Sequence, residues 1–403
     1  MRLNNLLIMT LLLIISSCSK YRVDTQRIPD LSLVTELNID SDLPIISISV
    51  NQEQFDFMVQ FYANDTIIPA FLKYYNPSGS IVFENASASL EIKGAASAKN
   101  EMKSLGFILD SAIDNSKDEI IIPSKVLENH SLEELKSFRL RNSGNDFGFS
   151  MIKDRTYTQL AIEAEADLDL MYGKPVHAFV NGSYYGLLNL RTESNVEGIS
   201  RLRNVSTERI TLLKVDVDNG KLEFRDGDEV WADKFLKAIK DENLNELWDM
   251  IEINNYIDYI VFQDYIGNRD WPKNNMRAYC IDQGKFRFFL YDLDYAAFHN
   301  KNDIIPTFEF EDHQMAKIYR ILREHKDFEK IFEERQKSLY SRLSFSTFSR
   351  IMDGLVEEIQ EEMPYLIAKY QLPKSEFHWK LNLSNVRRDF ERRDVYIRDK
   401  YDL

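Results

Sequence analysis

The hydrophobic period of the chain changes from that of strands to that of helices, and this change limits the fold more than any other feature. Leu43–Val50, Ser80–Gly94 and Lys103–Asp110 are rich in Ile, Val and Phe and are separated by turn residues, a pattern typical of strands. We therefore expect an antiparallel sheet over about residues 43–140.

Beyond this sheet the apolar residues recur at helical spacing. Met151–Gly173 is expected to form one helix that a glycine ends. Asn181 and Gly182 lie between two apolar runs, and this pair favours a tight hairpin turn, because both central positions of a type I′ turn need a positive φ. A small irregular hairpin is predicted over residues 214–229.

The remainder of the chain is predominantly helical by pattern. Residues 231–251 and 254–268 carry amphipathic spacing, and the region from about 311 to 403 continues it with an interruption at Pro364. The sequence therefore predicts an α+β fold in which a β-rich region precedes an α-rich one. Ligand sites often lie in clefts between such regions.

The N-terminus has the pattern of a secretory signal. Residues 1–17 combine one basic residue with a short apolar run, which is too short and wrongly flanked for a stable membrane span. Ile15–Cys18 resembles a bacterial lipobox, which implies cleavage before Cys18 and a lipid on its sulfur. An ordinary signal peptide with an incidental cysteine is the alternative. Residues 18–40 read as a tether to a domain over 41–403, so we expect a lipid-anchored protein of the cell envelope, with inner or outer membrane left open.

Cysteine use and net charge exclude some classes of protein. Cys18 and Cys280 are the two cysteines, so lipidation of Cys18 leaves no disulfide in the mature chain. Cys280 lies in an apolar strand and is expected to be a buried small hydrophobe rather than a nucleophile. Lys and Arg number 50 against 65 Asp and Glu, a net charge of −15, so general nucleic-acid binding is not expected.

A polar loop in the segment Gly267–Phe298 carries the first candidate site residues. Asp270 and Asn275 bracket a stretch that Pro272 keeps from forming a helix interior. A carboxylate can orient or deprotonate a hydroxyl, and an amide oxygen can bind a hard cation. The loop therefore combines the two kinds of group that a metal-assisted transfer reaction needs.

A second pair of carboxylates follows the buried strand of the same segment. Asp292 ends the apolar run and Asp294 lies two residues on. With Asn275 they would complete a Mg²⁺ or Mn²⁺ site, since these cations take oxygen ligands and keep positions for phosphate oxygens. An Asp, an Asn five residues later and a second Asp on metal is also the arrangement of protein kinases. A solvated turn with capping residues would explain the same residues.

Several motifs together resemble the CotH kinase family, the secreted kinases related to spore-coat protein H. The matching stretches are LEIKGAASAKNEMKSLGFIL, FRLRNSGNDFGFSMIKDRTYTQLA, VHAFVNGSYYGLLNLRTES, NRDWPKNNM and KFRFFLYDLDYAAF. They span about residues 85–300 in the order that the family has. With the N-terminal signal, the chain is identified as a lipoprotein member of the Bacteroides type.

The resemblance implies an atypical protein-kinase-like fold of two lobes. The N-terminal antiparallel β-rich lobe would cover about 41–195 and the α-rich lobe about 196–403. Such a protein would use ATP and Mg²⁺ or Mn²⁺ to phosphorylate a Ser, Thr or Tyr hydroxyl of a protein substrate. Asp270 would be the catalytic residue, and Asn275 and Asp292 would bind the metal, with Asp294 as a further candidate ligand.

The resemblance also implies a cation for the ATP phosphates. Lys103 matches the family's position for it, while Lys99 is a neighbouring competitor and a solvated lysine at the sheet edge is the alternative. The acidic partner of Lys103 is left open. Glu193 closes the hairpin and would lie on the adenine–ribose side of the cleft or cap its strand, and Glu163 and Glu165 lie on the predicted helix.

Two departures from the family pattern keep other functions open. Gly94 stands alone where protein kinases have a Gly-rich phosphate loop, and Tyr-Ala-Ala-Phe follows Asp294 where the family more often has Phe-Gly. A degenerate kinase scaffold that acts as a surface-anchored binding or assembly protein is therefore an alternative. A glycosidase using Asp270 and Asp292 is another, but it has no role for Lys103 or Asn275.

Two hydrolase classes lack their motifs. The 6 histidines are scattered and none belongs to a His-Glu-x-x-His pattern, so a zinc hydrolase is not expected. The chain also has no Gly-x-Ser-x-Gly for a serine nucleophile.

Overall fold

The computed structural model describes residues 29–109, 137–297, 299 and 301–402. The predicted signal peptide, Cys18 and the first part of the tether lie outside the described residues. Within the described ranges, no helix combines the length and apolarity that crossing a bilayer requires. The end of the tether segment packs on the domain, since Leu31, Val34 and Ile39 contact a small buried cluster of the barrel.

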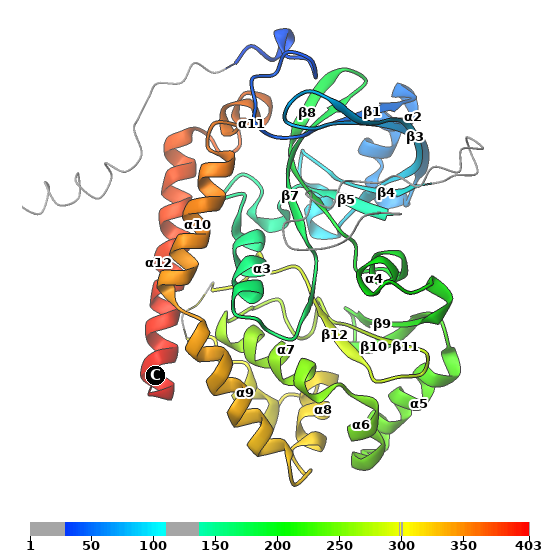
Figure 1. The fold of residues 1–403 in the computed structure, drawn as a ribbon, viewed down its shortest axis with the longest axis vertical. Coiled ribbons are helices and arrows are strands. Elements are labelled where there is room, and N and C mark those ends of the chain that lie inside the picture. The colour runs from blue at the N-terminus through cyan, green and yellow to red at the C-terminus, as the bar shows by residue number, and fades with distance from the viewer. Residues whose placement is uncertain (1–28, 110–136, 298, 300, 403) are drawn as a thin grey trace, which may run out of the picture.

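The N-terminal half forms a closed β-barrel with the strand order β1-β2-β3-β4-β5-β8-β7 (Figure 1). Neighbouring strands are antiparallel except β1 and β7, which pair in parallel and close the barrel. The strands are β1 (Ile45–Val50), β2 (Ile67–Tyr75), β3 (Ile81–Lys93), β4 (Ser104–Leu109), β5 (Ser137–Arg141), β7 (Gly173–Val180) and β8 (Ser183–Arg191). The predicted antiparallel sheet over 43–140 is thus present but incomplete, because the later hairpin supplies the closing strands.

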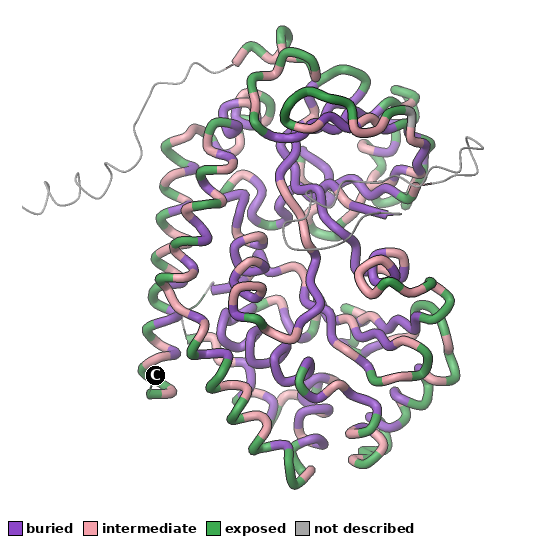
Figure 2. Tube along the Cα trace, viewed as in Figure 1, coloured by how far each residue is buried: buried purple, intermediate pink, exposed green. Residues whose placement is uncertain are grey.

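Alternation of apolar and polar residues decides which side chains of a barrel strand face the core. In β5, Phe138 and Leu140 are fully buried in the core, which places Arg139 and Arg141 on the opposite face of the strand. Figure 2 shows the same division across the molecule, with buried residues on the inner strands and exposed residues along the outer helices.

The predicted hairpin at Asn181–Gly182 is confirmed. Their φ values are +48° and +78°, and Val180 pairs with Ser183 across the turn between β7 and β8. The Asn181 side chain also accepts a hydrogen bond of 2.9 Å from the Val50 amide, which fixes the turn against β1.

The predicted helix over 151–173 is wrong in its extent. The helix α3 covers only Lys153–Glu163, and Glu165 then takes a positive φ of +49° that ends the helical path. The following residues form the short strand β6 (Asp169–Leu170). The Asp169 carboxylate accepts 2.9 Å hydrogen bonds from Tyr279 and Arg287, so distant residues override the local helical period.

A second sheet lies below the barrel in Figure 1, with the order β10-β9-β11-β12-β6. Its remaining strands are β9 (Ile210–Asp216), β10 (Lys221–Asp226), β11 (Arg277–Ile281) and β12 (Arg287–Leu290). The predicted irregular hairpin at 214–229 is confirmed as β9 and β10, with a register shift between Phe224 and Asp226. Cys280 is buried in β11, as expected, and burial raises the pKa of its thiol to about 12.

Helices cover this sheet and run along one side of the barrel. They are α2 (Gln52–Gln60), α4 (Val196–Arg203), α5 (Glu229–Lys240), α6 (Leu244–Met250), α7 (Ile253–Tyr265), α8 (Gln314–Leu322), α9 (Phe328–Arg342), α10 (Phe345–Ile359), α11 (Met363–Tyr370) and α12 (Glu376–Tyr401). Short 3-10 turns named η lie between them. Pro364 stands in the first turn of α11, so the expected interruption is confirmed. The fold is mixed α+β, with a β-rich N-terminal and a helical C-terminal region.

Aromatic packing joins the C-terminal helices to α3. Phe390 of α12 stacks on Phe348 of α10 with ring centroids 3.9 Å apart, and the Tyr157 ring of α3 lies 5.9 Å from Phe390. All three side chains are fully buried. The position of α3 therefore depends on contacts with the last helices of the chain.

Replacing Phe390 with alanine should lower the free energy of unfolding by about 3–5 kcal/mol, because it leaves a cavity among three helices. Phe377→Ala on the same helix removes a ring that is 72% exposed and should change it by less than about 0.5 kcal/mol. Urea unfolding followed by circular dichroism measures both. Equal losses in the two variants would contradict this packing.

Candidate functional site

The polar loop predicted from sequence follows the buried helix α7. Gly267 leaves that helix with a φ of +56°, and the Trp271 side chain anchors the loop, with its ring 5.4 Å from Tyr259 and 5.9 Å from Phe308. Trp271 is 3% exposed, so the apolar anchor sits directly beside the half-buried Asp270. The loop is thus held by burial on one side and presents polar groups on the other.

Asp270 and Asn275 are in contact. The Asp270 carboxylate accepts hydrogen bonds of 2.8 Å from the Asn275 amide and 3.0 Å from Asn274. Burial and the negative charge of Asp292 raise the pKa of Asp270 above its usual range, against the effect of these two amides. Asp292 therefore lies close enough for its charge to act on Asp270, as the sequence predicted.

Asp292 and Asp294 both bind one guanidinium group. Arg141 Nη2 donates to Asp292 and, over 3.0 Å, to Asp294. Asp294 also accepts 2.8 Å and 3.1 Å bonds from the backbone and side-chain amides of Asn145. Asp292 has a φ of +61°, which ends the path of the preceding strand and turns this segment toward Arg141.

A third carboxylate joins the network from α3. Asp154 lies 3.3 Å from Arg141 Nε, accepts from Arg191 and accepts a 3.0 Å bond from the Leu293 amide. Burial works against its charge, yet Arg191 and Arg141 hold the pKa of Asp154 below its usual range. The pKa of Arg141 is likewise raised by its carboxylates in spite of burial. Arg141 thus connects the barrel, α3 and the segment after β12.

The loop after β5 fits tightly against this network. Gly144 has a φ of +63°, and a Cβ there would clash with Asp294 Oδ2 and Arg141 Nη2. Asn142 holds the loop through a 2.9 Å bond from Ser104 and a 2.6 Å bond to the Met102 carbonyl. A side chain larger than glycine at residue 144 would separate Arg141 from Asp294.

Lys103 does not join these carboxylates. It lies just before β4, where its Nζ donates 2.7 Å to the Ala98 carbonyl and sits 4.4 Å from the Tyr62 ring. Burial lowers the pKa of Lys103. Lys99 is exposed at the end of the 3-10 turn η3 (Ala96–Lys99). The cation that contacts the predicted metal carboxylates is Arg141.

The glutamates considered as partners of Lys103 bind arginines instead. Glu193 accepts two bonds of 3.0 Å from Arg139, while Glu163 binds Arg350 and Glu165 binds Arg342. Of these, Glu193 is buried at the end of β8, and its pair with Arg139 lies on the same strand face as Arg141.

Three basic side chains, of Arg139, Lys214 and Arg277, lie beside the carboxylates, and they were not predicted as site residues from the sequence. Arg277 of β11 is directly opposite Lys214 of β9, and like charges in this position destabilise a sheet. Burial, together with Arg277, Arg225, Arg139 and Lys93, lowers the pKa of Lys214. The Arg277 guanidinium also lies 4.8 Å from the ring of Tyr291, the residue before Asp292. We call Arg139, Lys214 and Arg277 the basic strip.

The signals for Arg141 and Arg139 were present in the sequence. Phe138 to Arg141 alternates apolar and basic residues, which places both arginines on one face of a strand. The pairing of Lys214 with Arg277 had no such signal, since it depends on the register of β9 and β11.

The charges of the site fit a divalent cation. Four carboxylates lie around Arg141, Arg191 and Lys153: they are Asp154, Asp270, Asp292 and Asp294. Oxygen donors with excess negative charge are what Mg²⁺ and Mn²⁺ prefer. Over the described part of the chain, no three His, Cys, Asp or Glu side chains form a metal cluster by themselves.

A comparison with protein families gives one match. The model of the family described as CotH kinase protein matches residues 90–397, which is well over half of the chain. No curated protein matches the chain.

Replacing Asp294 with asparagine should change how stability depends on pH. Burial and the charge of Asp292 raise the pKa of Asp294 from 3.8 to about 7, since Arg141 is shared among several carboxylates. The folded protein then holds a proton that the unfolded chain loses, so this group's contribution falls as pH rises from about 4 to 7. In urea unfolding with EDTA present, the free energy of unfolding of Asp294→Asn minus that of the wild type should therefore increase as pH rises across that range. A difference independent of pH would contradict the raised pKa.

Proposed function

The chain belongs to the CotH kinase protein family, and from this premise we propose that it is an atypical protein kinase of the cell envelope. It would transfer the γ-phosphoryl group of ATP to a Ser, Thr or Tyr hydroxyl of a protein. A two-lobed, kinase-like arrangement of the barrel and the helical region is part of this proposal.

The proposal rests on one observation: carboxylates and basic side chains lie together around the end of one strand. Asp292 follows β12, with Asp270 and its Asn275 partner near it and the basic strip on the adjoining strands. A metal needs the carboxylates, and a triphosphate needs the cations. A site that served a neutral ligand would have no use for both.

Asp270 would take the acceptor proton. Its pKa is raised by burial and by Asp292, which brings a carboxylate nearer to the range in which it can act as a base. The bonds from Asn274 and Asn275 fix the orientation of this carboxylate. The acceptor hydroxyl would therefore meet a base that is already positioned.

Asn275 and Asp292 would hold Mg²⁺ or Mn²⁺, with Asp294 as a further ligand. A divalent cation at this position supplies positive charge to the phosphate oxygens of the nucleotide. Asn145 keeps Asp294 in place through two hydrogen bonds, and Arg141 keeps both aspartates on the same side of the loop.

The phosphates would be bound mainly by arginines. Arg141 contacts Asp292, and Arg277 lies against the ring of the preceding Tyr291, whereas the Nζ of Lys103 donates to the Ala98 carbonyl. Lys103 would act from the neighbouring loop, which Ser104 joins to Asn142 by a 2.9 Å bond. Glu193 would orient Arg139 at the edge where the adenine and ribose would lie.

The second candidate is a degenerate kinase scaffold that binds a partner at the surface. The observation that favours it is Arg141, which engages Asp292 and Asp294 together and so occupies oxygens that a metal would use. Nucleotide binding that depends on metal separates the two functions.

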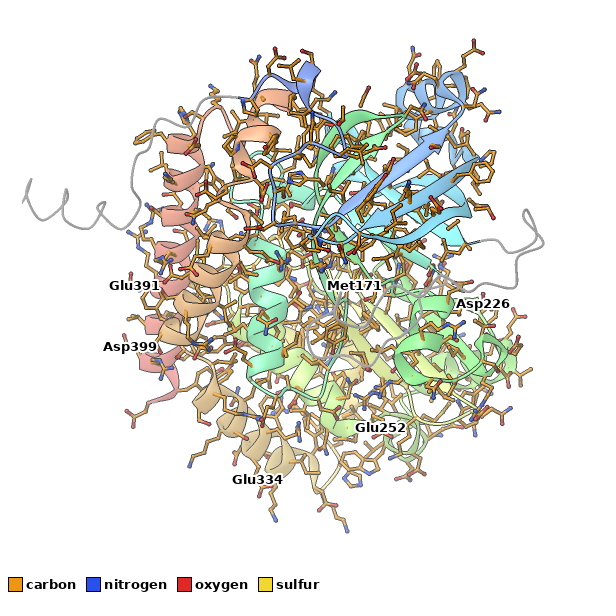
Figure 3. The ribbon with its side chains drawn as sticks, turned by 45° about the horizontal axis from the view of Figure 1, so that its top comes forward. Met171, Asp226, Glu252, Glu334, Glu391 and Asp399 are labelled. Carbon is orange, nitrogen blue, oxygen red and sulfur yellow. The ribbon has the colours of Figure 1, made fainter. Side chains whose placement is uncertain are left out.

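The place and partners of the protein also belong to the proposal. Lipid attachment at Cys18 would hold the domain at a membrane of the cell envelope, where it would meet its protein substrates. The net charge of −15 disfavours nucleic acid as a partner. In Figure 3 the acidic residues Glu334, Glu391 and Asp399 lie on the outer faces of α9 and α12, in keeping with that charge.

Asp270→Asn should lower phosphoryl transfer from labelled ATP to casein by about 100-fold or more, because the positioned base is lost. ATP affinity should change little. The matched control is Asp226→Asn, an exposed carboxylate of β10. The control should keep the activity of the wild type, and transfer that survives in Asp270→Asn at a similar rate would contradict the assignment.

Asp292→Ala should remove the metal dependence of nucleotide binding. Calorimetry with ATP, with and without Mn²⁺, is expected to show tighter binding with metal in the wild type and equal binding in the variant. If the wild type binds ATP equally well with and without Mn²⁺, the metal role is refuted and the degenerate scaffold is supported.

A further inference from the structure

A cavity of about 430 Å³ lies behind α3, where that helix faces α10 and the start of β7. Met171, labelled near the middle of the view in Figure 3, is one of its lining residues. Cavities that bind small organic ligands have volumes of roughly 300–1,000 Å³. This one is therefore large enough for a small ligand, and no residue of the candidate site described above lines it except Arg191.

Cationic side chains from four elements line this cavity. They are Arg155 of α3, Lys174 of β7, Arg191 of β8 and Arg350 of α10. A concentration of positive charge is unusual for a chain whose net charge is −15. We call this cavity the basic pocket.

Carboxylates leave part of this charge unmatched at Arg155 and Arg191. Glu358 binds Arg155 at 2.7 Å through Nη2 only, whereas Glu163 binds both Nη atoms of Arg350. Arg155 Nη1 and Arg191 Nε are buried and have no hydrogen-bond partner among the described residues. Buried polar groups of proteins are nearly always paired, so these two donors call for an acceptor.

Arg191 is the more constrained of the two. It is 2% exposed, and its Nη atoms donate to Asp154, to Thr158 and, over 2.8 Å, to the Met171 carbonyl. Burial lowers the pKa of Arg191, against the effect of the Asp154 charge. An anion in the pocket would supply an acceptor for Arg191 Nε and a negative charge beside this buried guanidinium.

Part of the pocket wall is apolar, next to the polar side chains of Thr158 and Gln159. Ile162, Ile351 and Leu355 line it. A bare inorganic ion would leave this wall unused, whereas an ester would place its charged group on the arginines and its carbon chain on the wall. Guanidinium groups that approach from different elements suit a tetrahedral group with several charged oxygens.

We propose that the basic pocket is a binding site for a phosphate monoester, whose phosphoryl oxygens accept hydrogen bonds from Arg155 and Arg191. Arg350 and Lys174 add positive charge at its edge, and Ile351 and Leu355 contact the organic part. The site is separate from the nucleotide site and does not depend on the proposed kinase activity. Arg191 nevertheless joins the two, since it lines the pocket and donates to Asp154.

The test is calorimetric titration of the domain with O-phosphoserine, inorganic phosphate and serine. O-phosphoserine should bind more tightly than inorganic phosphate, and serine should give no signal. Arg155→Gln should weaken O-phosphoserine binding by about 10-fold or more, which is what the loss of a charge-assisted hydrogen bond causes. Arg350→Gln changes a side chain that is 66% exposed and should weaken binding without affecting folding.

Three controls distinguish this pocket from other anion sites. Arg387→Gln removes an arginine of α12 that pairs with Asp353 outside the pocket, and binding should be unchanged. Glu358→Gln removes a competing carboxylate and should tighten binding. Arg277→Gln changes the basic strip of the candidate nucleotide site and should leave O-phosphoserine binding intact, because no contact links Arg277 to the pocket among the described residues.

Either of two results would overturn the proposal. One is no binding of O-phosphoserine or phosphate to the wild type at millimolar concentration. The other is binding that persists in Arg155→Gln and Arg350→Gln, or that is lost in Arg277→Gln, since the anion would then lie at another site.

Discussion

A buried guanidinium that is shared among carboxylates holds this structure together at its centre. Arg141 is 7% exposed and reaches Asp154 of α3 as well as Asp292 and Asp294 after β12. Arg141 is more than a hundred positions from Asp292 and Asp294 in the sequence, so the interaction joins the barrel to the helical half. A buried charge without its partners costs several kcal/mol, and each element must therefore keep its place for the network to exist.

The candidate site is a consequence of this arrangement. β5 supplies Arg139 and Arg141 on one face, β12 ends at Asp292, and the loop after α7 brings Asp270 and Asn275 alongside. Arg141 and Arg191 lie among more carboxylates than they can neutralise, and burial together with the charge of Asp292 raises the pKa of Asp294. This excess of carboxylates would suit a divalent cation beside Asp292.

Local patterns in the sequence predicted the features that local energetics decide. The Asn181–Gly182 turn, the hairpin of β9 and β10 and the helix start at Pro364 depend on backbone preferences of a few residues. The spacing of Asp270, Asn275 and Asp292 likewise predicted that these three residues lie near one another, and they do. The end of α3 was missed, because bonds from Tyr279 and Arg287 to Asp169 decide it from far along the chain.

Features that depend on strand register or on barrel closure could not be predicted from the sequence. Lys103 matched a family motif, yet the cation on the aspartates is Arg141, and only the pairing of β5 with β8 and the loop at Gly144 place it there. The opposition of Lys214 and Arg277 arises in the same way, from the register of two strands.

The most direct test of the account is a crystal structure of the domain with Mn²⁺ and a non-hydrolysable ATP analogue. We predict an anomalous manganese peak beside Asp292 and Asn275, with the phosphates over Arg139, Lys214 and Arg277 and with Arg141 moved off Asp292. A nucleotide bound elsewhere, with Arg141 still on both aspartates and no metal beside Asp292, would contradict the central claim.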